Sequence, residues 1–246
     1  MIVSIMQPAY LPWLGYFDRI AKSDLHIVLD DVNLDANSKT KFANRNKVRT
    51  PTEWSWLTVP LQSKGKHGEL FLNAVEISAD ASWRQKHLGA LKSNYARARH
   101  FSAHRAFFEE IYGREWKRLI DLTTVTTDYL RSAFELNCPI QRSSAMGVEG
   151  EKDALILNLC RAVGATTYIS GPFGRDYLDA AAFATAGIEL VFHDYPHPTY
   201  AQAFTGFEPF MSAVDLLFNH GPASRGQLCR AASSLSAGAP TPTVVA

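Results

Sequence analysis

Two short β-type segments, separated by a proline-rich turn and a short helical pattern, constrain the fold of this chain most strongly. Residues 2–6 and 25–29 are rich in apolar and β-branched residues, which favours strands. Pro8 and Pro12 end the first strand, because proline fixes φ and lacks a backbone N–H. Three apolar residues then recur at the spacing of one helix face: Leu14, Phe17 and Ile20. The sequence therefore predicts a strand-turn-helix-strand unit.

The C-terminal half contains a second unit of the same kind. Residues 166–169 predict a strand that ends in Ser170 and Gly171, residues 175–186 a helix, and residues 188–192 another strand. A strand, a helix and a strand in this order form a right-handed βαβ unit with parallel strands. We expect an α/β fold whose parallel or mixed central sheet comes from both units, with their carboxyl ends on one rim, where ligands bind in such sheets.

The segments between and after the two units have different patterns. Residues 81–137 carry apolar and aromatic residues at spacings of three and four, which predicts a helical layer inserted between the units. Residues 30–49 and 62–69 are polar and are expected to form loops, the second of them mobile. We predict one α/β domain over residues 1–221, followed at 222–246 by a disordered tail rich in Ala, Ser, Pro and Thr.

Composition excludes several classes of protein. The 246 residues include 25 Lys and Arg against 24 Asp and Glu, so no excess of positive charge indicates DNA or RNA binding. The three cysteines, Cys138, Cys160 and Cys229, are far apart and show neither a disulfide framework nor a zinc motif. No apolar run approaches the ~20 residues of a membrane span. We therefore expect a soluble, cytoplasmic protein.

Six blocks of sequence follow one another along the chain and resemble the WbqC-like proteins of bacteria. The blocks are QPAYLPWLGYFDRIAKSDLHIVLDDV at 7–32, NRNK at 44–47, WLTVP at 56–60, YISG at 168–171, HPTYAQ at 197–202 and SAVDLLFNHG at 212–221. Genes of this family lie mainly in clusters for O-antigen and other polysaccharides, where amino-sugar modification has been suggested. The resemblance thus implies a transferase that adds an acyl or aminoacyl group to the amine of a sugar or nucleotide sugar. It implies no particular cofactor.

Residue chemistry suggests roles for individual side chains in such a transfer. His197 stands between two prolines that limit where its ring points, so we predict that it is the general base for the attacking amine. Asp31 or Asp18 would orient the imidazole or the amine. The remaining predicted residues would bind the sugar or an anionic group of donor or acceptor: Gln7, Tyr10, Trp13, Tyr16, Asn44, Arg45, Asn46, Ser170, Gly171, Tyr200 and Gln202.

Several alternatives stay open at this point. The aromatic residues could be core anchors, and the amides at 44 and 46 could bind their own backbone, as Asn does in turns. Asp30 and Asp31 could bring Mg²⁺ to a phosphate, but adjacent carboxylates more often begin a solvated loop, and we predict no metal site.

Two other functional classes also remain. The chain could be a non-catalytic module that binds a glycan or nucleotide sugar. It could also be a nucleotidyl-transfer enzyme, because Trp13-Leu14-Gly15-Tyr16 has the HxGH spacing of such enzymes, although both histidines are replaced.

Overall fold

A six-stranded sheet in the order β5-β2-β1-β6-β7-β8 forms the centre of the computed structural model, which describes residues 1–34, 42–62, 70–229 and 234–237. A separate two-stranded ribbon consists of β3 and β4. The strands are β1 Ile2–Met6, β2 Leu25–Val28, β3 Arg45–Arg49, β4 Trp54–Thr58, β5 Ile140–Arg142, β6 Thr167–Ser170, β7 Glu189–Asp194 and β8 Ser234–Ala237.

The sheet is doubly wound. Strand β1 pairs in parallel with β2 on one side and with β6 on the other, and β5 and β7 extend the two halves in parallel. Strand β8 closes one edge antiparallel to β7, so the sheet is mixed. The predicted α/β class with N- and C-terminal βαβ-type units is confirmed. Because the chain winds outward in opposite directions from β1 and β6, the topological switch point lies between these two strands.

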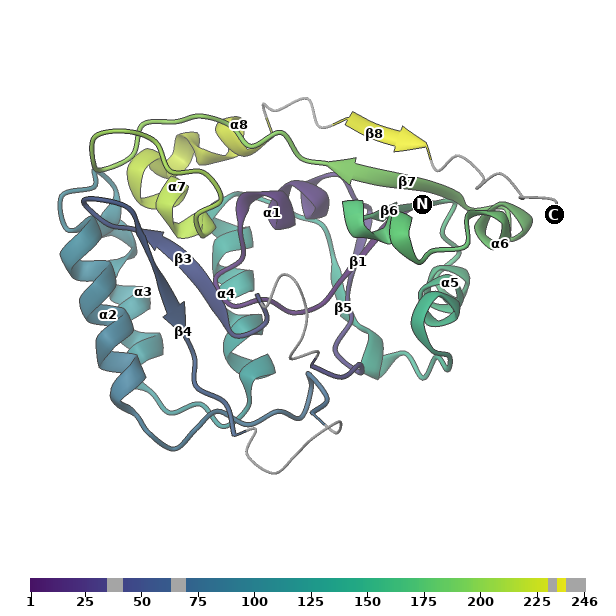
Figure 1. The fold of residues 1–246 in the computed structure, drawn as a ribbon, viewed down its shortest axis with the longest axis horizontal. Coiled ribbons are helices and arrows are strands. Elements are labelled where there is room, and N and C mark those ends of the chain that lie inside the picture. Colours follow the sequence, from purple (N-terminus) through teal and green to yellow (C-terminus); the bar gives the residue numbers. More distant parts are fainter. Residues whose placement is uncertain (35–41, 63–69, 230–233, 238–246) are drawn as a thin grey trace.

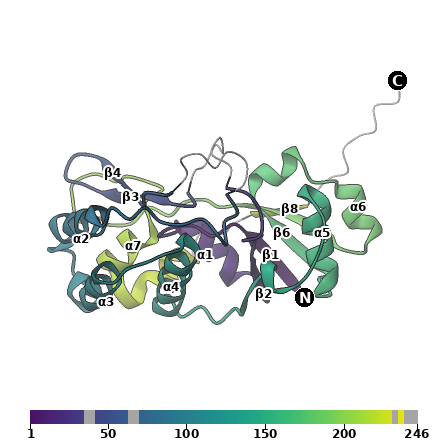
Figure 2. The same ribbon diagram turned by 90° about the horizontal axis from the view of Figure 1, so that it is seen from below.

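Helices cover both faces of the sheet. The α-helices are α1 Leu14–Ala21, α2 Ser82–Tyr95, α3 Phe101–Gly113, α4 Leu119–Ala133, α5 Lys152–Ala162, α6 Ala180–Thr185, α7 Ala213–His220 and α8 Ser224–Leu228; the 3-10 helices are η1 Ser143–Ala145, η2 Pro172–Asp176 and η3 Gly221–Ala223. Figures 1 and 2 show α5 and α6 at one end of the molecule and α2, α3, α4 and α7 at the other. The predicted helical layer within 81–137 is thus present as α2, α3 and α4.

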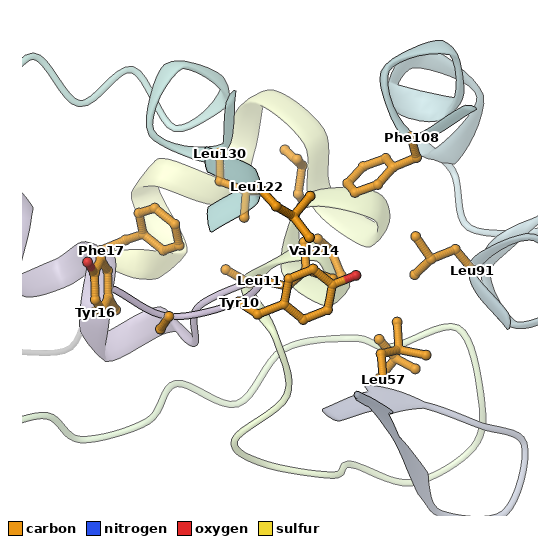
Figure 3. Packing of buried hydrophobic residues seen from close by; sticks show 14 of the residues in the cluster. Tyr10, Leu11, Tyr16, Phe17, Leu57, Leu91, Phe108, Leu122, Leu130 and Val214 are labelled. Carbon is orange, nitrogen blue, oxygen red and sulfur yellow. The ribbon is translucent and has the colours of Figure 1, made fainter. Parts of the chain in front are cut away.

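Two clusters of buried apolar residues hold these layers together. One joins the sheet to α5 and α6, with Val3, Ile5 and Phe192 among its members. The larger cluster joins α1, α7 and the inserted helices to the β3-β4 ribbon. In Figure 3, Tyr10 and Leu11 point from the turn after β1 into this second cluster, between side chains of α2, α3, α4, α7 and β4. The turn that follows the first strand is therefore fixed from behind by the inserted layer.

Some segments differ from their predicted structure. Strand β3 lies inside the polar stretch predicted as a loop, because its residues pair with β4 and Asn46 and Val48 are buried. The predicted tail begins with η3 and α8, and β8 lies within it, since α8 packs against α1 and β8 pairs with β7. The predicted mobile loop falls mostly on residues 63–69, outside the described residues.

Over the described residues, no helix is both long and apolar enough to cross a membrane. The assignment of residues 1–221 to a single domain stays a prediction.

Candidate functional site

A cavity of about 630 Å³ opens at the topological switch point of the sheet. Met6 and Gln7 line it at the carboxyl end of β1, and Ser170 and Gly171 at the carboxyl end of β6. Its volume falls in the range of about 300–1,000 Å³ that is usual for small-molecule sites. Position and size together make this cavity the candidate binding site, because doubly wound sheets bind ligands at this edge.

A buried histidine-carboxylate pair lies beside the cavity. Nε2 of His193, on β7, is 2.6 Å from Oδ2 of Asp18, on α1, and their side chains are 1% and 0% exposed. Nζ of Lys22 donates to Oδ1 of the same carboxylate at 2.6 Å. Burial raises the pKa of Asp18, but the hydrogen bonds from His193 and Lys22 lower it more, so the net pKa lies below its ordinary value. Asp18 is therefore an ionised hydrogen-bond acceptor for the imidazole.

The second ring nitrogen of His193 is left for other chemistry. With the Nε2 proton donated to Asp18, Nδ1 carries the lone pair, and among the described residues it has no hydrogen-bond partner. The residue lines the cavity. A histidine oriented by a carboxylate, with its other nitrogen available, is the usual arrangement for general acid-base catalysis.

Arg19, the residue after Asp18 on α1, brings a positive charge to the cavity wall. Its side chain lines the cavity although only 8% of the residue is exposed. The Nε atom is fully buried, and the guanidinium has no hydrogen-bond or ion-pair partner among the described residues. Burial lowers the pKa of Arg19, an effect that its ionisable neighbours, among them Asp18, offset in part. Arginine stays protonated even so.

Aromatic side chains surround the mouth of the cavity. Phe173, Tyr177 and Phe210 are 52%, 55% and 57% exposed, and all three line it. They are three of the five large apolar side chains that are exposed among the described residues. Trp13 and Tyr195, both partly buried, also line the cavity. Such a rim offers flat apolar faces to a sugar or base ring.

The structure brings four of the predicted binding residues to the cavity: Gln7, Trp13, Ser170 and Gly171. Asp18 lies behind the wall and reaches the cavity only through His193. The first and last thirds of the chain share one sheet, as predicted, but His197, which was expected to face Gln7, Tyr10 and Trp13 across one hollow, does not line the cavity.

Two predicted catalytic residues lie elsewhere. His197 does not line the cavity, and backbone groups occupy both of its nitrogens: Nδ1 donates to the Pro198 carbonyl at 2.9 Å and Nε2 accepts the Phe210 N–H at 3.1 Å. Asp31 accepts a hydrogen bond from Ser143 Oγ. The extended backbone around His197 does restrict its ring, as expected, but directs it to its own loop. Both residues have structural contacts here.

The other aromatic and amide residues of the predicted set have structural contacts too. The hydroxyl group of Tyr10 is hydrogen-bonded to His87 and Tyr112, and that of Tyr16 lies 3.4 Å from His26 Nε2. The hydroxyl group of Tyr200 and the amide of Gln202 donate to the buried carboxylate of Asp215. All of these polar tips are satisfied inside the protein. The alternative in which such aromatics are core anchors describes Tyr10, Tyr16 and Tyr200.

The Asn44-Arg45-Asn46 group ties the chain to itself. Asn44 donates to the Val59 carbonyl at 2.8 Å, and buried Asn46 donates to the Leu11 carbonyl at 2.7 Å. The Arg45 guanidinium lies 4.2 Å from the centroid of the Trp56 ring. Asn46 therefore fixes the turn after β1 and does not contact the cavity.

Sequence reasoning missed Arg19, His193 and Tyr195. His193 lies near the end of an apolar strand, where alternation alone places it in the core. The sequence feature that could have identified His193 is a polar residue at an expected buried position, close to the carboxyl end of a strand. Arg19 is polar on a short helix that has an apolar face, a pattern that favours a solvated position.

Metal ligands do not gather near the cavity or elsewhere in the described residues, since no group of three or more His, Cys, Asp or Glu there could hold an ion. Asp30, proposed with Asp31 as a possible Mg²⁺ ligand, is paired with Arg142 and hydrogen-bonded to Ser143 and Ser144.

Comparison with known proteins identifies relatives of this chain. The model of the WbqC-like protein family matches residues 7–227. A protein of Mycobacterium tuberculosis (strain ATCC 25618 / H37Rv), described as "Uncharacterized protein Rv1507c", is 34% identical over 221 residues, which cover 89% of this chain and 94% of that protein. No solved structure matches the chain significantly.

Proposed function

Since this chain belongs to the WbqC-like protein family, we propose that it is a transferase of bacterial surface polysaccharide synthesis, such as O-antigen synthesis. It modifies a sugar or nucleotide sugar in the switch-point cavity by transferring an acyl or aminoacyl group to a sugar amine. The three free thiols fit a cytoplasmic location for this reaction. The single observation that carries the proposal is the buried Asp18-His193 pair at the cavity wall.

The pair supplies the proton transfer that such a reaction needs. The amine nitrogen of the sugar forms a bond to the carbonyl carbon of an activated donor, and the bond between that carbon and its leaving group breaks. His193 Nδ1 takes the proton that the amine loses and passes it to the leaving group. Asp18 holds the ring through Nε2 and stabilises the imidazolium while it carries the extra proton.

Other cavity residues bind the sugar in this proposal. The exposed amide of Gln7, at the carboxyl end of β1, offers hydrogen bonds to sugar hydroxyl groups, while the hydroxyl group of Ser170 is buried and donates to the Gly171 carbonyl at 3.2 Å. Trp13 and the three exposed rim aromatics offer faces for stacking. The oxygen-rich edge of a sugar and its apolar ring face are thus both matched.

The test is a turnover assay with a panel of nucleotide amino sugars and acyl or aminoacyl donors, with products read by mass spectrometry. His193→Asn should lower the transfer rate roughly 10²- to 10⁴-fold, the usual contribution of acid-base catalysis. His104→Asn is a matched control, because His104 pairs with the Tyr129 hydroxyl group on the inserted layer and does not line the cavity. Wild-type turnover in folded His193→Asn protein would remove the pair from the mechanism.

A non-catalytic sugar-binding module is the second candidate, and the aromatic rim favours it, because stacking on exposed rings binds sugars without any chemistry. In that case wild-type protein would bind members of the panel and form no product. Nucleotidyl transfer has less support: the residues at the two histidine positions are a half-buried Trp13 and a buried Tyr16, neither of which is a cation for phosphates.

A further inference from the structure

We propose that Arg19 and the backbone at Gly171 form a phosphate subsite in the cavity. The substrate class is then a phosphorylated sugar with a ring system at the rim, as in a nucleoside diphosphate sugar. This inference rests on the proposed function for the identity of the sugar. The subsite itself is inferred from the burial and the surroundings of the Arg19 side chain.

The first observation is that Arg19 is a buried cation without a partner among the described residues. Leaving such a charge unpaired is strongly unfavourable, so proteins normally pair it. Arg49, 2% exposed, provides the contrast: its Nε also lacks a partner, but its two Nη atoms donate to the carbonyl oxygens of Thr50, Glu53 and Thr205. Arg19 makes no such hydrogen bonds among the described residues, and its side chain lines a cavity.

The second observation is that no nearby carboxylate is free to neutralise the guanidinium. The adjacent Asp18 already accepts from His193 and Lys22 through its two oxygens. The other ionisable groups near the guanidinium belong to Tyr168, Tyr16 and Tyr177, which carry no charge at neutral pH and so do not neutralise it. This wall of the cavity therefore favours an anionic ligand, and the planar guanidinium matches the oxygens of a phosphate.

The third observation is the close approach of Arg19 to Gly171. A methyl group built at Gly171 would lie 3.0 Å from Nη2 and 3.3 Å from Nη1 of Arg19. Gly171 has φ −74° and ψ 166°, an extended conformation open to any residue, so conformation does not require glycine there. What glycine provides is space: the guanidinium can lie against the backbone directly after β6, at the edge where doubly wound sheets bind phosphates.

Helix α1 adds to the positive potential. It begins at the cavity, where Trp13 and Gly15 line the wall, and its N-cap residue Trp13 makes no side-chain capping hydrogen bond. Helical side chains lean toward the N-terminus of their helix, so Arg19 on the last turn points back toward that end. The partial positive charge of a helix N-terminus and the guanidinium thus act on the same cavity.

The rim identifies the rest of the ligand class. Phe173, Tyr177 and Phe210 are exposed at the cavity mouth, while Arg19 is buried within it. A ligand with phosphate groups inside and flat rings outside satisfies both regions. A nucleoside diphosphate sugar has this distribution, and a free sugar has no group for Arg19.

Calorimetric titration with uridine diphosphate, inorganic pyrophosphate and uridine tests the subsite. Wild-type protein should bind uridine diphosphate at least about tenfold more tightly than uridine, and Arg19→Met should remove roughly 10- to 100-fold of that affinity without changing uridine binding. Gly171→Ala should weaken uridine diphosphate binding in the same direction. Gly89→Ala is the matched control, because a methyl group there meets no atom within 4 Å.

Thermal unfolding of the ligand-free proteins separates this role from a structural one. Arg19→Met should melt at the same temperature as wild type or higher, since it removes an unpaired buried charge, whereas Arg49→Met should melt well below wild type. Equal binding of uridine diphosphate and uridine by wild type, unchanged affinity in Arg19→Met, or a large loss of stability in that variant would each overturn the subsite.

The failure of the transferase proposal has a different signature. Phosphorylated ligands that bind through Arg19, with no product from any donor, would reject the transferase and leave the subsite. Turnover of nucleotide amino sugars by Arg19→Met with the wild-type kcat/KM would reject the subsite and leave the transferase.

Discussion

Asp18→Asn isolates the buried carboxylate of the Asp18-His193 pair while it keeps the shape of the side chain. In wild type, one carboxylate oxygen accepts from His193 Nε2 and the other from Lys22 Nζ, both at 2.6 Å. An amide has a single oxygen, so only one of these donors keeps an acceptor. Lys22 is a quarter exposed and can turn to water, whereas His193 is 1% exposed and cannot.

The stability change follows from the bond to the imidazole. A buried hydrogen bond to a charged group contributes about 1.5–3 kcal/mol, while the partly exposed bond to Lys22 contributes about 0–1 kcal/mol. The amide keeps a neutral hydrogen bond to His193, which contributes about 0.5–1.5 kcal/mol, so we expect Asp18→Asn to lower the free energy of unfolding by about 1–3 kcal/mol at pH 7, measured by urea denaturation. If the amide N–H instead donates to Nε2, the imidazole proton moves to Nδ1, and transfer activity falls roughly 10²- to 10⁴-fold.

The lowered pKa of Asp18 determines how the stability difference between wild type and Asp18→Asn changes with pH. The pKa of Asp18 is lower in the folded protein than in the unfolded chain. Its contribution is therefore complete above the unfolded pKa of about 3.9 and is lost as the pH falls through the folded value. The difference in unfolding free energy between wild type and Asp18→Asn should shrink in acid, because the protonated carboxyl then resembles the amide.

Asp128→Asn is a suitable control, since the Asp128 side chain is 50% exposed in its ion pair with Arg131 and the change should cost less than about 0.5 kcal/mol. A stability difference for Asp18→Asn that is absent at pH 7, or that stays constant from pH 7 into acid, would refute the assignment of Asp18 as an ionised partner of His193.

Two further predictions concern residues that sequence reasoning placed in the site. His197→Asn should keep transfer within about twofold of wild type but lower the melting temperature, because the Phe210 N–H loses its acceptor; a loss of activity comparable to that of His193→Asn would contradict this. Asn46→Ala should lower the free energy of unfolding by about 1–3 kcal/mol in urea, because the buried Leu11 carbonyl loses its donor, while uridine diphosphate affinity stays at the wild-type value; a loss of affinity in folded protein would make Asn46 a ligand contact.

Local sequence patterns predict the architecture of this protein well. The spacing of Leu14, Phe17 and Ile20 predicts α1, and β-type segments on either side predict β1 and β2. The second unit follows the same rules, and the right-handed crossover then places Gln7 and Ser170 on one edge. These features depend on neighbours in sequence and on general chain geometry, which the amino-acid sequence specifies directly.

The identity of the polar groups at the site depends on packing between distant elements. The helical pattern predicts one buried face for α1, yet all residues from Leu14 to Ile20 are buried, because α8 also packs against this helix. Arg19 is enclosed on another side, where its guanidinium lies against Gly171 after β6. His197 was predicted as the base from the two prolines beside it, which is a local feature. The hydrogen bond between His193 and Asp18 joins residues that are 175 positions apart. No local pattern contains that contact.

The contact of Tyr10 with the inserted helices has a consequence for how this family can diversify. Its hydroxyl group joins the turn after β1 to His87 on α2 and Tyr112 on α3, within a buried aromatic cluster. The inserted helices therefore fix the turn that forms one wall of the cavity. This wall should keep its conformation when a ligand binds. We expect the outward surfaces of α2 and α3 to vary between relatives, while a change at Tyr10, His87 or Tyr112 should loosen the wall that Pro8 and Ala9 form.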